Sequence, residues 1–247
     1  MKYLMDNATF EKIYQVLSPM KGIHTNEVSE LRLFIEAVYY ICRAGCSWRL
    51  LPHYYGDWRS IHKRFKQWSD KGIWKILFEQ AQIDPDLELV MIDSTIVRAH
   101  ACAAGYMQDK QALGRSAGGF TTKIHALVDA LGNPLKFILT PGQRSDHTQA
   151  TALIENVSDT MVLGDKGYSS NLLIEELRKR RCFAVIPSKN NSENPHEYDK
   201  YIYKERHLIE CFFGKIKHFR RVFSRFDKLA QTFLSFVYFV GTLTWFK

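Results

Sequence analysis

Cysteine is scarce in this chain, and its spacing excludes two common architectures of small proteins. Five cysteines occur among 247 residues, and no pair has the Cys-x-x-Cys spacing. An odd count argues against a disulfide framework, and the missing pairs argue against a zinc ribbon. We therefore expect reduced thiols, as in a cytoplasmic protein.

Long uncharged runs are also missing. The longest includes residues 230–246, which contain Gln, Gly and several Thr. A transmembrane helix needs about 20 predominantly apolar residues, so we expect a buried helix there and no membrane partner. Asp6 and Glu11 interrupt the N-terminal region, which therefore lacks a signal-peptide pattern.

Positive charge, in contrast, is plentiful and local. The formal net charge is +8. Residues 200–228 hold nine Lys and Arg against three Asp and Glu, whereas residues 1–86 hold twelve against ten. A concentrated basic stretch indicates a polyanionic partner, and nucleic acid is the commonest.

Residues 1–84 are predicted to form a small, all-helical N-terminal domain. Apolar residues recur at helical spacing in "NATFEKIYQVLSP", capped by Asn7, in "SELRLFIEAVYYICRAG", and twice in "GDWRSIHKRFKQWSDKGIWKILFEQA". The last segment carries Arg59, Lys63 and Arg64 beside aromatic residues, which favours a helix-turn-helix-like module that binds DNA. A helical cap with a solvated basic face explains the same pattern equally well.

Residues 85–247 are predicted to form a second domain, of the α/β class. After "DPDLE" the pattern changes to apolar and β-branched strands, beginning with "LELVMIDSTIVRA". The predicted order is three strands, helix, strand, helix, strand and final helices. This order indicates a mixed central sheet with helices on both faces.

Two acids in this domain stand at unusual positions. Asp93 lies inside the first strand, where burying a carboxylate is costly unless a partner pairs with it. Asp165 follows an apolar strand, at the edge where ligands collect in open α/β sheets, although it also suits a turn or a helix cap. Ser145 or Asp146, by contrast, is expected to cap the helix that follows.

Glu210 is a third acid of interest, in a helix predicted over residues 203–221. At about 100° per residue, this helix carries a phenylalanine-rich face and, along one edge of it, a polar stripe. The stripe consists of Tyr203, Arg206, Glu210, Lys217 and Arg221. A salt bridge between Glu210 and Arg206, one turn apart, is the alternative explanation.

Converging carboxylates repel one another unless divalent cations neutralise them. Mg²⁺ prefers oxygen ligands and keeps positions for water and phosphate, and two such ions about 4 Å apart can drive phosphodiester cleavage. Arg206, Lys217 and Arg221 would then hold neighbouring phosphates. This hypothesis requires the three acids to meet at one spot.

The segments that carry these residues resemble bacterial insertion-sequence transposases of the DDE type, in particular the insertion-sequence-five family. The resemblance spans nearly the whole chain and includes "MIDSTIVRAH", "PGQRSDHTQA" and "VLGDKGY". Its most specific element is the signature Tyr-x2-Arg-x3-Glu-x6-Lys. Every position of that signature is filled here, by Tyr203, Arg206, Glu210 and Lys217.

The resemblance implies an RNase H-like catalytic domain in which Asp93, Asp165 and Glu210 bind Mg²⁺ or Mn²⁺, with two ions. It implies a transposase that binds terminal inverted repeats and catalyses strand cleavage and strand transfer without a covalent intermediate. Tyr203, Arg206 and Lys217 would orient the DNA ends. The implied partners are the double-stranded DNA of the transposon ends and target and at least a second copy of the chain, in the bacterial cytoplasm at the nucleoid.

Other polar residues of this domain have two interpretations each. Lys166 and Tyr168 follow the second acid and either contact DNA or belong to the surface of an ordinary loop. Lys123 and His125 lie two residues apart on one strand face, and either line the site or are ordinary sheet residues.

Two other functions remain compatible with the sequence. One is a catalytically silent DNA-binding repressor of transposition with the same fold. The other is a general RNase H-like nuclease, which would cut DNA without regard to end sequence and would never join its product to a second duplex. The three acids and their Tyr, Arg and Lys companions favour the active transposase.

Overall fold

The computed structural model describes residues 5–20, 23, 27–104, 111–116, 119–189 and 195–246. The chain forms two compact units. Unit 1 consists of Met1–Ile83, Ala99–Tyr106 and Ile216–Lys247, and unit 2 of Asp84–Arg98 and Met107–Lys215.

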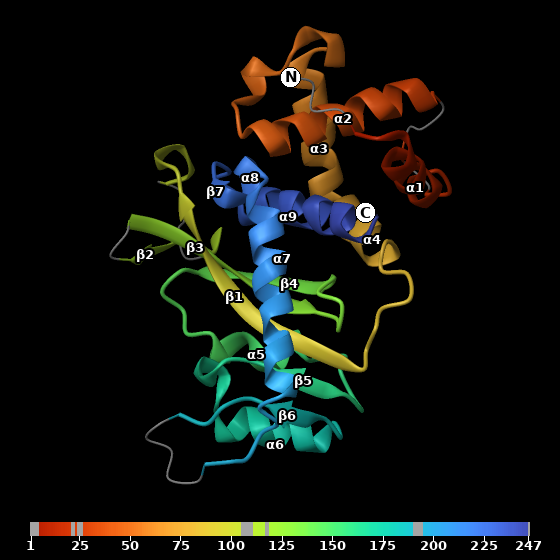
Figure 1. Ribbon diagram of the computed structural model, residues 1–247. Coiled ribbons are helices and arrows are strands. Elements are labelled where there is room, and N and C mark those ends of the chain that lie inside the picture. Colours follow the sequence, from red (N-terminus) through yellow and green to blue (C-terminus); the bar gives the residue numbers. More distant parts are fainter. Residues whose placement is uncertain are drawn as a thin grey trace. The chain divides into compact units, whose positions relative to one another are not determined.

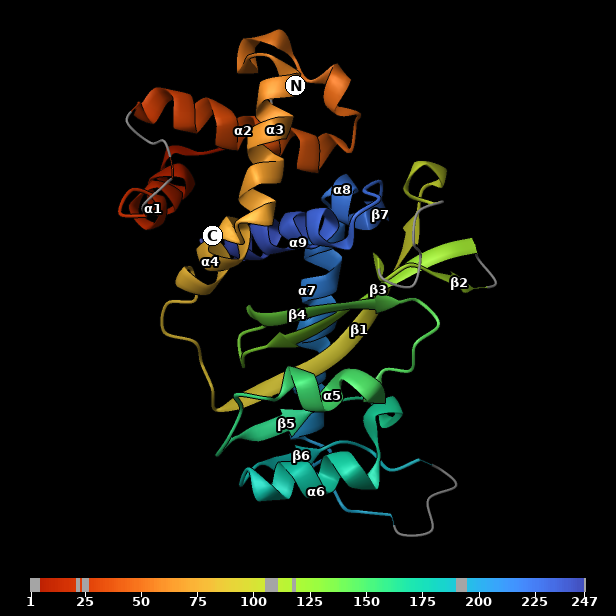
Figure 2. The same cartoon turned by 180° about the vertical axis from the view of Figure 1, so that it is seen from behind.

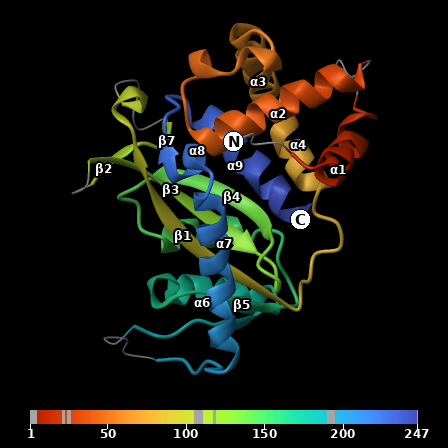
Figure 3. The same ribbon diagram turned by 45° about the horizontal axis from the view of Figure 1, so that its top comes forward.

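Unit 1 is helical, as predicted for its N-terminal part (Figure 3). Its helices are α1 (Asn7–Leu17), α2 (Val28–Ala44), α3 (Trp58–Asp70), α4 (Ile73–Gln80), α8 (Arg220–Phe223) and α9 (Ala230–Trp245), with 3-10 turns at Trp48–Leu50, His53–Tyr55 and Ala101–Ala103 and a short strand β7 (Ser224–Arg225). Asp6, not Asn7, caps α1, because its carboxylate accepts the Thr9 N–H at 2.8 Å.

Aromatic side chains fill the core of unit 1. Phe65 of α3 stacks on Phe236 of α9 at 4.4 Å between ring centres and lies 5.2 Å from Trp74 of α4. The uncharged run near the C-terminus therefore forms the buried helix α9, as expected. In the part of the chain that the structure describes, no helix is both long and apolar enough to cross a membrane.

Unit 2 is built on a mixed sheet (Figure 1). Its strands are β1 (Leu89–Ala99), β2 (Gly114–Ser116), β3 (Gly119–Val128), β4 (Pro134–Pro141), β5 (Met161–Leu163) and β6 (Phe183–Val185). Their order is β2-β3-β1-β5-β6, with β4 also paired to β3. The pair β1–β3 is antiparallel, whereas β1–β5 and β5–β6 are parallel.

Helices cover both faces of this sheet (Figures 1 and 2). They are α5 (His147–Leu153), α6 (Asn171–Lys179) and α7 (His207–Lys217). Ile92 of β1 packs in one core cluster with Leu153 of α5 and Leu177 of α6, while Phe212 of α7 stacks on Phe137 of β4. The predicted α/β class and the two covered faces are confirmed.

The predicted single helix over 203–221 is wrong. A 3-10 turn covers Ile202–Arg206, α7 ends at Lys217, and α8 begins at Arg220. Phe219 between them is extended (φ −87°, ψ 107°) and buries its ring beside Tyr39. The break changes the rotation of the residues after it, and Phe223 at the end of α8 is exposed.

The compact units divide the chain differently from the predicted domains. The first boundary lies at 83/84 and the prediction at 84/85, but residues 216–247 group with the N-terminal helices. The functional assignment of residues 1–84 to DNA binding and 85–247 to catalysis stays a prediction.

Candidate active site

Strand β1 directs Asp93 and Ser94 to opposite faces of the sheet, because side chains alternate along a strand. Ile92 lies on the face covered by α5 and α6, so Ser94 shares that face and Asp93 points to the side of α7. The Asp93 carboxylate accepts the Ser94 N–H at 2.7 Å and Nη1 of Arg206 at 2.6 Å. Burial raises the pKa of Asp93, an effect that Ser94 and Arg206 oppose and the charge of Asp165 increases.

Arg206 joins Asp93 to Glu210. Its Nη1 bonds Oδ2 of Asp93, and its Nη2 bonds Oε1 of Glu210 one turn along the chain. The side chains of Arg206 and Asp93 are 19% and 18% exposed, whereas that of Glu210 is 57% exposed. The salt bridge weighed as an alternative for Glu210 is therefore present, and the same guanidinium also holds an acid from the first strand.

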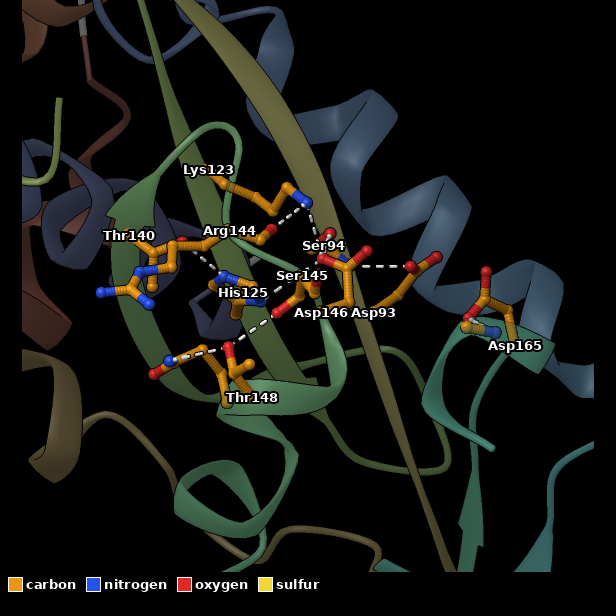
Figure 4. Close-up of polar contacts among 12 residues, drawn as sticks. Asp93, Ser94, Lys123, His125, Thr140, Arg144, Ser145, Asp146, Thr148 and Asp165 are labelled. Carbon is orange, nitrogen blue, oxygen red and sulfur yellow. Dashed lines mark hydrogen bonds and ion pairs between the residues drawn. The ribbon is translucent and has the colours of Figure 1, made fainter. Parts of the chain in front are cut away.

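Asp165 follows the neighbouring strand at a matched position. The parallel pairing of β1 and β5 aligns Met91 with Leu163, and Asp93 and Asp165 each lie two residues further along (Figure 4). The Asp165 carboxylate accepts the Gly167 N–H at 2.9 Å and so caps the 3-10 turn Lys166–Tyr168.

The three acids do not form a closed ligand set. Within the described residues, no three His, Cys, Asp or Glu side chains are grouped so that they could hold a metal ion. The structure brings Asp93 and Glu210 together through Arg206, with Asp165 on the adjacent strand. Their oxygens are the donors that Mg²⁺ and Mn²⁺ prefer, and a guanidinium cation already lies between two of them, so the donor set fits a divalent ion.

A second polar network lies beside Asp93, and its centre is Asp146 (Figure 4). Asp146 occupies the N-cap position of α5 but makes no capping hydrogen bond. Instead it accepts from Ser94 Oγ at 2.6 Å and pairs with Lys123 Nζ at 3.0 Å. Burial acts to raise the pKa of Asp146, but these two partners outweigh it and lower the pKa. The expected capping role is thus wrong for the side chain.

His125 is an ordinary buried residue of the sheet. Its Nε2 lies 2.8 Å from Thr140 Oγ1, and its Nδ1 faces Asp146 at 3.8 Å. Burial lowers the pKa of His125 to about 4, so the ring is neutral at pH 7. Lys123 is also buried and donates to the Arg144 carbonyl at 2.8 Å. Neither side chain is therefore presented to a ligand.

Sequence reasoning missed Ser94 and the true role of Asp146. The available signal was the alternation along β1, which puts Ser94 on the face opposite to Asp93. In the structure, Ser94 pairs with His125 of β3. The partner of Ser94, Asp146 in "PGQRSDHTQA", could not be found from that pattern, because Asp146 reaches the sheet from the loop before α5.

The remaining predicted DNA contacts differ in exposure. Lys166 is exposed, whereas Tyr168 is fully buried, so the proposed contact of Tyr168 with DNA is wrong. Tyr203 is half-buried, with its ring edge-on to Tyr198 at 5.4 Å. Lys217, in unit 1 by the division above, is half-buried.

The structure contradicts the DNA-binding prediction for Arg221. Its side chain is 6% exposed and pairs with the equally buried Asp227 at 3.0 Å. Its Nη1 also donates to the Cys46 carbonyl at 3.0 Å. The helix break at Phe219 turned this residue from the predicted polar stripe into the interior.

The basic residues of α3 fall into two classes. Arg59 and Lys63 are exposed. Arg64 is half-buried, with its guanidinium 4.5 Å from the ring centre of Phe34 and 5.3 Å from that of Trp68. Arg64 thus helps to hold the helices of unit 1 together.

The chain matches two families and several known proteins. The family described as "Transposase DDE domain" matches residues 84–238, and "Putative transposase of IS4/5 family" matches residues 5–78. A relative from Brucella ovis, "Putative transposase for insertion sequence element IS6501", is 34% identical over 132 residues, which cover 51% of this chain and 99% of the relative. One from Burkholderia cepacia, for insertion sequence element IS402, is 31% identical over 122 residues, which cover 44% of this chain and 56% of that protein.

Solved structures give weaker likenesses. A piggyBac transposase synaptic complex with hairpin DNA aligns with a TM-score of 0.43 and 13% identity, over 75% of this chain and 47% of that one. A pre-cleavage Mos1 transpososome aligns with a TM-score of 0.30 and 10% identity, over 92% and 81%. This chain thus spans about half the length of the piggyBac protein. Neither likeness is close enough to place individual residues.

Proposed function

Because this chain belongs to the family of DDE-domain transposases of insertion sequences, we propose that it cuts and rejoins DNA at the ends of its element. Asp93, Asp165 and Glu210 are the proposed catalytic acids and the ligands of two Mg²⁺ or Mn²⁺ ions. The proposed partners are the terminal inverted repeats, a target duplex and at least one further copy of the chain.

The observation that carries this proposal is the double contact of Arg206. One guanidinium bonds Asp93 of the first strand and Glu210 of a late helix. Two acids far apart in the sequence thereby reach one place beside the strand that precedes Asp165. A structural role alone would not require two carboxylates there, because one acid suffices to pair one arginine.

The chemistry assigned to these residues is phosphoryl transfer. Bound divalent ions supply an activated water and stabilise the leaving oxygen. Asp93 lies within β1 and Asp165 two residues past the end of β5, so the sheet supports both. Glu210 is the most exposed of the three. Tyr203, Arg206 and Lys217 hold phosphates of the DNA end, and positioning with charge neutralisation accounts for catalysis.

Lys166 and two residues of α3 are also proposed to bind DNA. Lys166 follows Asp165 directly and is exposed, as are Arg59 and Lys63. Arg64 and Arg221 are not part of this proposal, because both are engaged inside unit 1.

The test is cleavage of duplex DNA that carries the inverted repeats flanking the gene. We expect Mg²⁺-dependent nicking at the repeat and joining of the new 3′ end to a second duplex. Glu210→Gln should lower the rate more than about 100-fold, since even the outer partners of metal ligands cost about 10- to 100-fold. The control is Glu205→Gln, which removes an exposed carboxylate from the preceding turn and should leave cleavage unchanged.

Three outcomes would contradict the proposal. Repeat binding without cleavage by either the wild type or Glu210→Gln would identify a repressor. Cleavage that ignores the repeat and never yields a joined product would identify a general nuclease. Full activity of Glu210→Gln would remove this acid from the site.

A further inference from the structure

Arg206 occupies the place of a cation between two carboxylates. Its two terminal nitrogens bond different acids, Asp93 and Glu210. The guanidinium and the Asp93 side chain are both less than one-fifth exposed, so water screens this contact only in part. Arginine does not lose its proton in proteins, and the positive charge is therefore permanent.

Each oxygen of Asp93 already accepts a hydrogen bond. Oδ1 accepts the Ser94 N–H at 2.7 Å, and Oδ2 accepts Arg206 Nη1 at 2.6 Å. The first donor is backbone of the same strand and cannot leave without distorting β1. The second is the end of a long side chain, which can swing away. Each carboxylate oxygen keeps a second acceptor site, so the competition is one of charge. A divalent ion bonded to Oδ2 of Asp93 at about 2.1 Å would repel the guanidinium on the same oxygen, and this repulsion favours displacement of Arg206.

We propose that Arg206 is the internal counterion of the metal-free site and competes with the divalent ion for Asp93 and Glu210. This inference rests on the proposed function, since it takes these acids as metal ligands. It adds that metal binding and the Arg206 contacts oppose one another at Asp93. The released guanidinium is then available to a DNA phosphate, the role that the signature implies for it.

The inference predicts that a substitution in the active site raises the affinity for the metal ion, whereas loss of an active-site residue usually weakens binding. Removing Arg206 should strengthen metal binding, because the acids lose their internal partner and gain net negative charge. If Arg206 instead served to align the two carboxylates for the ion, its removal would weaken metal binding. The two explanations thus predict opposite changes in one measured affinity.

The experiment is a titration with Mn²⁺ alone, without DNA or turnover, followed by electron paramagnetic resonance of free Mn²⁺. Arg206→Gln should bind at least about tenfold tighter than the wild type, equivalent to about 1.4 kcal/mol. Arg206→Lys should lie between, because an ammonium keeps the charge but lacks the fork that spans two acids. Circular dichroism confirms that each variant is folded, and Arg206→Lys carries the test if Arg206→Gln is not.

Two further variants complete the design. Lys204→Gln removes the same charge two residues away, from a side chain over the Tyr201 ring, and should leave the affinity nearly unchanged. An equal increase of Mn²⁺ affinity in Lys204→Gln would show that loss of any nearby positive charge strengthens metal binding, and it would overturn the inference. Unchanged or weaker binding in Arg206→Gln would overturn it as well.

Asp165→Asn separates this inference from the proposed function. Asp165 supplies a proposed ligand, and its carboxylate bonds the Gly167 N–H, not Arg206. Mn²⁺ binding that is weakened by Asp165→Asn but not strengthened by Arg206→Gln defeats only the counterion role. Binding that ignores Asp165→Asn defeats the metal site itself.

Discussion

Burial decides the charge state of His125, which lies near the candidate site. His125 and Lys123 lie on the face of Ser94, and both contribute to the network around Asp146. Lys123 pairs with the Asp146 carboxylate at 3.0 Å, whereas His125 has no hydrogen-bonded acid, and burial keeps its ring neutral. If Nδ1 of His125 carries the proton, it points at Asp146 and leaves Nε2 to accept from Thr140, and this tautomer avoids placing a lone pair against the carboxylate.

At the residue scale, we predict a pH dependence of stability that belongs to His125. Its pKa is about 4 in the folded protein against an ordinary value of 6.5. Between these values the unfolded chain binds more protons, so the free energy of unfolding falls as the pH is lowered from 6.5 to about 4. The loss is at most about 1.4 kcal/mol per pH unit, and the contribution is fully present above 6.5.

Urea unfolding of the wild type and of His125→Gln, at pH 7 and at pH 5, measures this contribution. The wild type should lose more stability between the two pH values than the variant, in which Gln can still bond Thr140. Equal losses would show that His125 does not titrate on unfolding as described.

Individual residues also show where sequence reasoning ends. The position of Asp93 followed from its apolar neighbours, and the cost of burying a carboxylate required a partner for it. The identity of that partner, Arg206, did not follow, because the contact joins elements 113 residues apart. Asp146 was predicted to be a cap because its position before a helix can be read from neighbouring residues. Its bonds to Ser94 and Lys123 join distant parts of the sequence and could not be read in this way.

Elements were predicted well wherever their pattern was local. The strands β1, β3 and β4 and the helices α5 and α6 appear in the predicted order. The prediction of one long helix over 203–221 was wrong, because its apolar and polar faces assume an unbroken helix and α7 ends at Lys217. Nothing in the periodicity marks Phe219, whose extended backbone is stabilised by the burial of its ring near Tyr39 and Arg43.

At the element scale, we predict that Arg221 stabilises unit 1 and does not contact DNA. Arg221→Ala leaves the carboxylate of Asp227 buried without its partner, and breaking such a pair costs about 3–5 kcal/mol. Arg220→Ala, one residue earlier and exposed, should cost far less. Thermal or urea unfolding of the two variants gives the comparison, and equal stabilities would contradict the buried role.

At the scale of the whole molecule, the class of fold followed from the sequence and the grouping of segments did not. The alternation of strands and helices predicted the mixed sheet with two covered faces. The C-terminal helix α9 could be predicted as buried, but its place among the N-terminal helices depends on contacts such as Phe65 with Phe236. Such contacts between distant segments leave no periodic trace in a single sequence.

We predict that the charge of unit 1 contributes to DNA affinity through Arg59 and Lys63. Replacing both with Gln should weaken binding of a random-sequence duplex and reduce the salt slope of log K by about 1.8, since each lost phosphate contact removes about 0.9. Fluorescence anisotropy at several salt concentrations measures both quantities.

The control for this prediction is Lys75→Gln on α4, whose ammonium faces Glu79 at 3.4 Å. It removes a charge from the same unit and should alter the slope little. An unchanged slope in the double variant would favour the solvated helical cap that the sequence left open.

The central claim is that Asp93, Asp165 and Glu210 share divalent ions. An anomalous-difference map from crystals grown with Mn²⁺ tests it most directly. We predict Mn²⁺ bonded to oxygens of all three carboxylates, with Arg206 withdrawn from Asp93. Mn²⁺ bound elsewhere, or held without any one of these acids, would contradict the account.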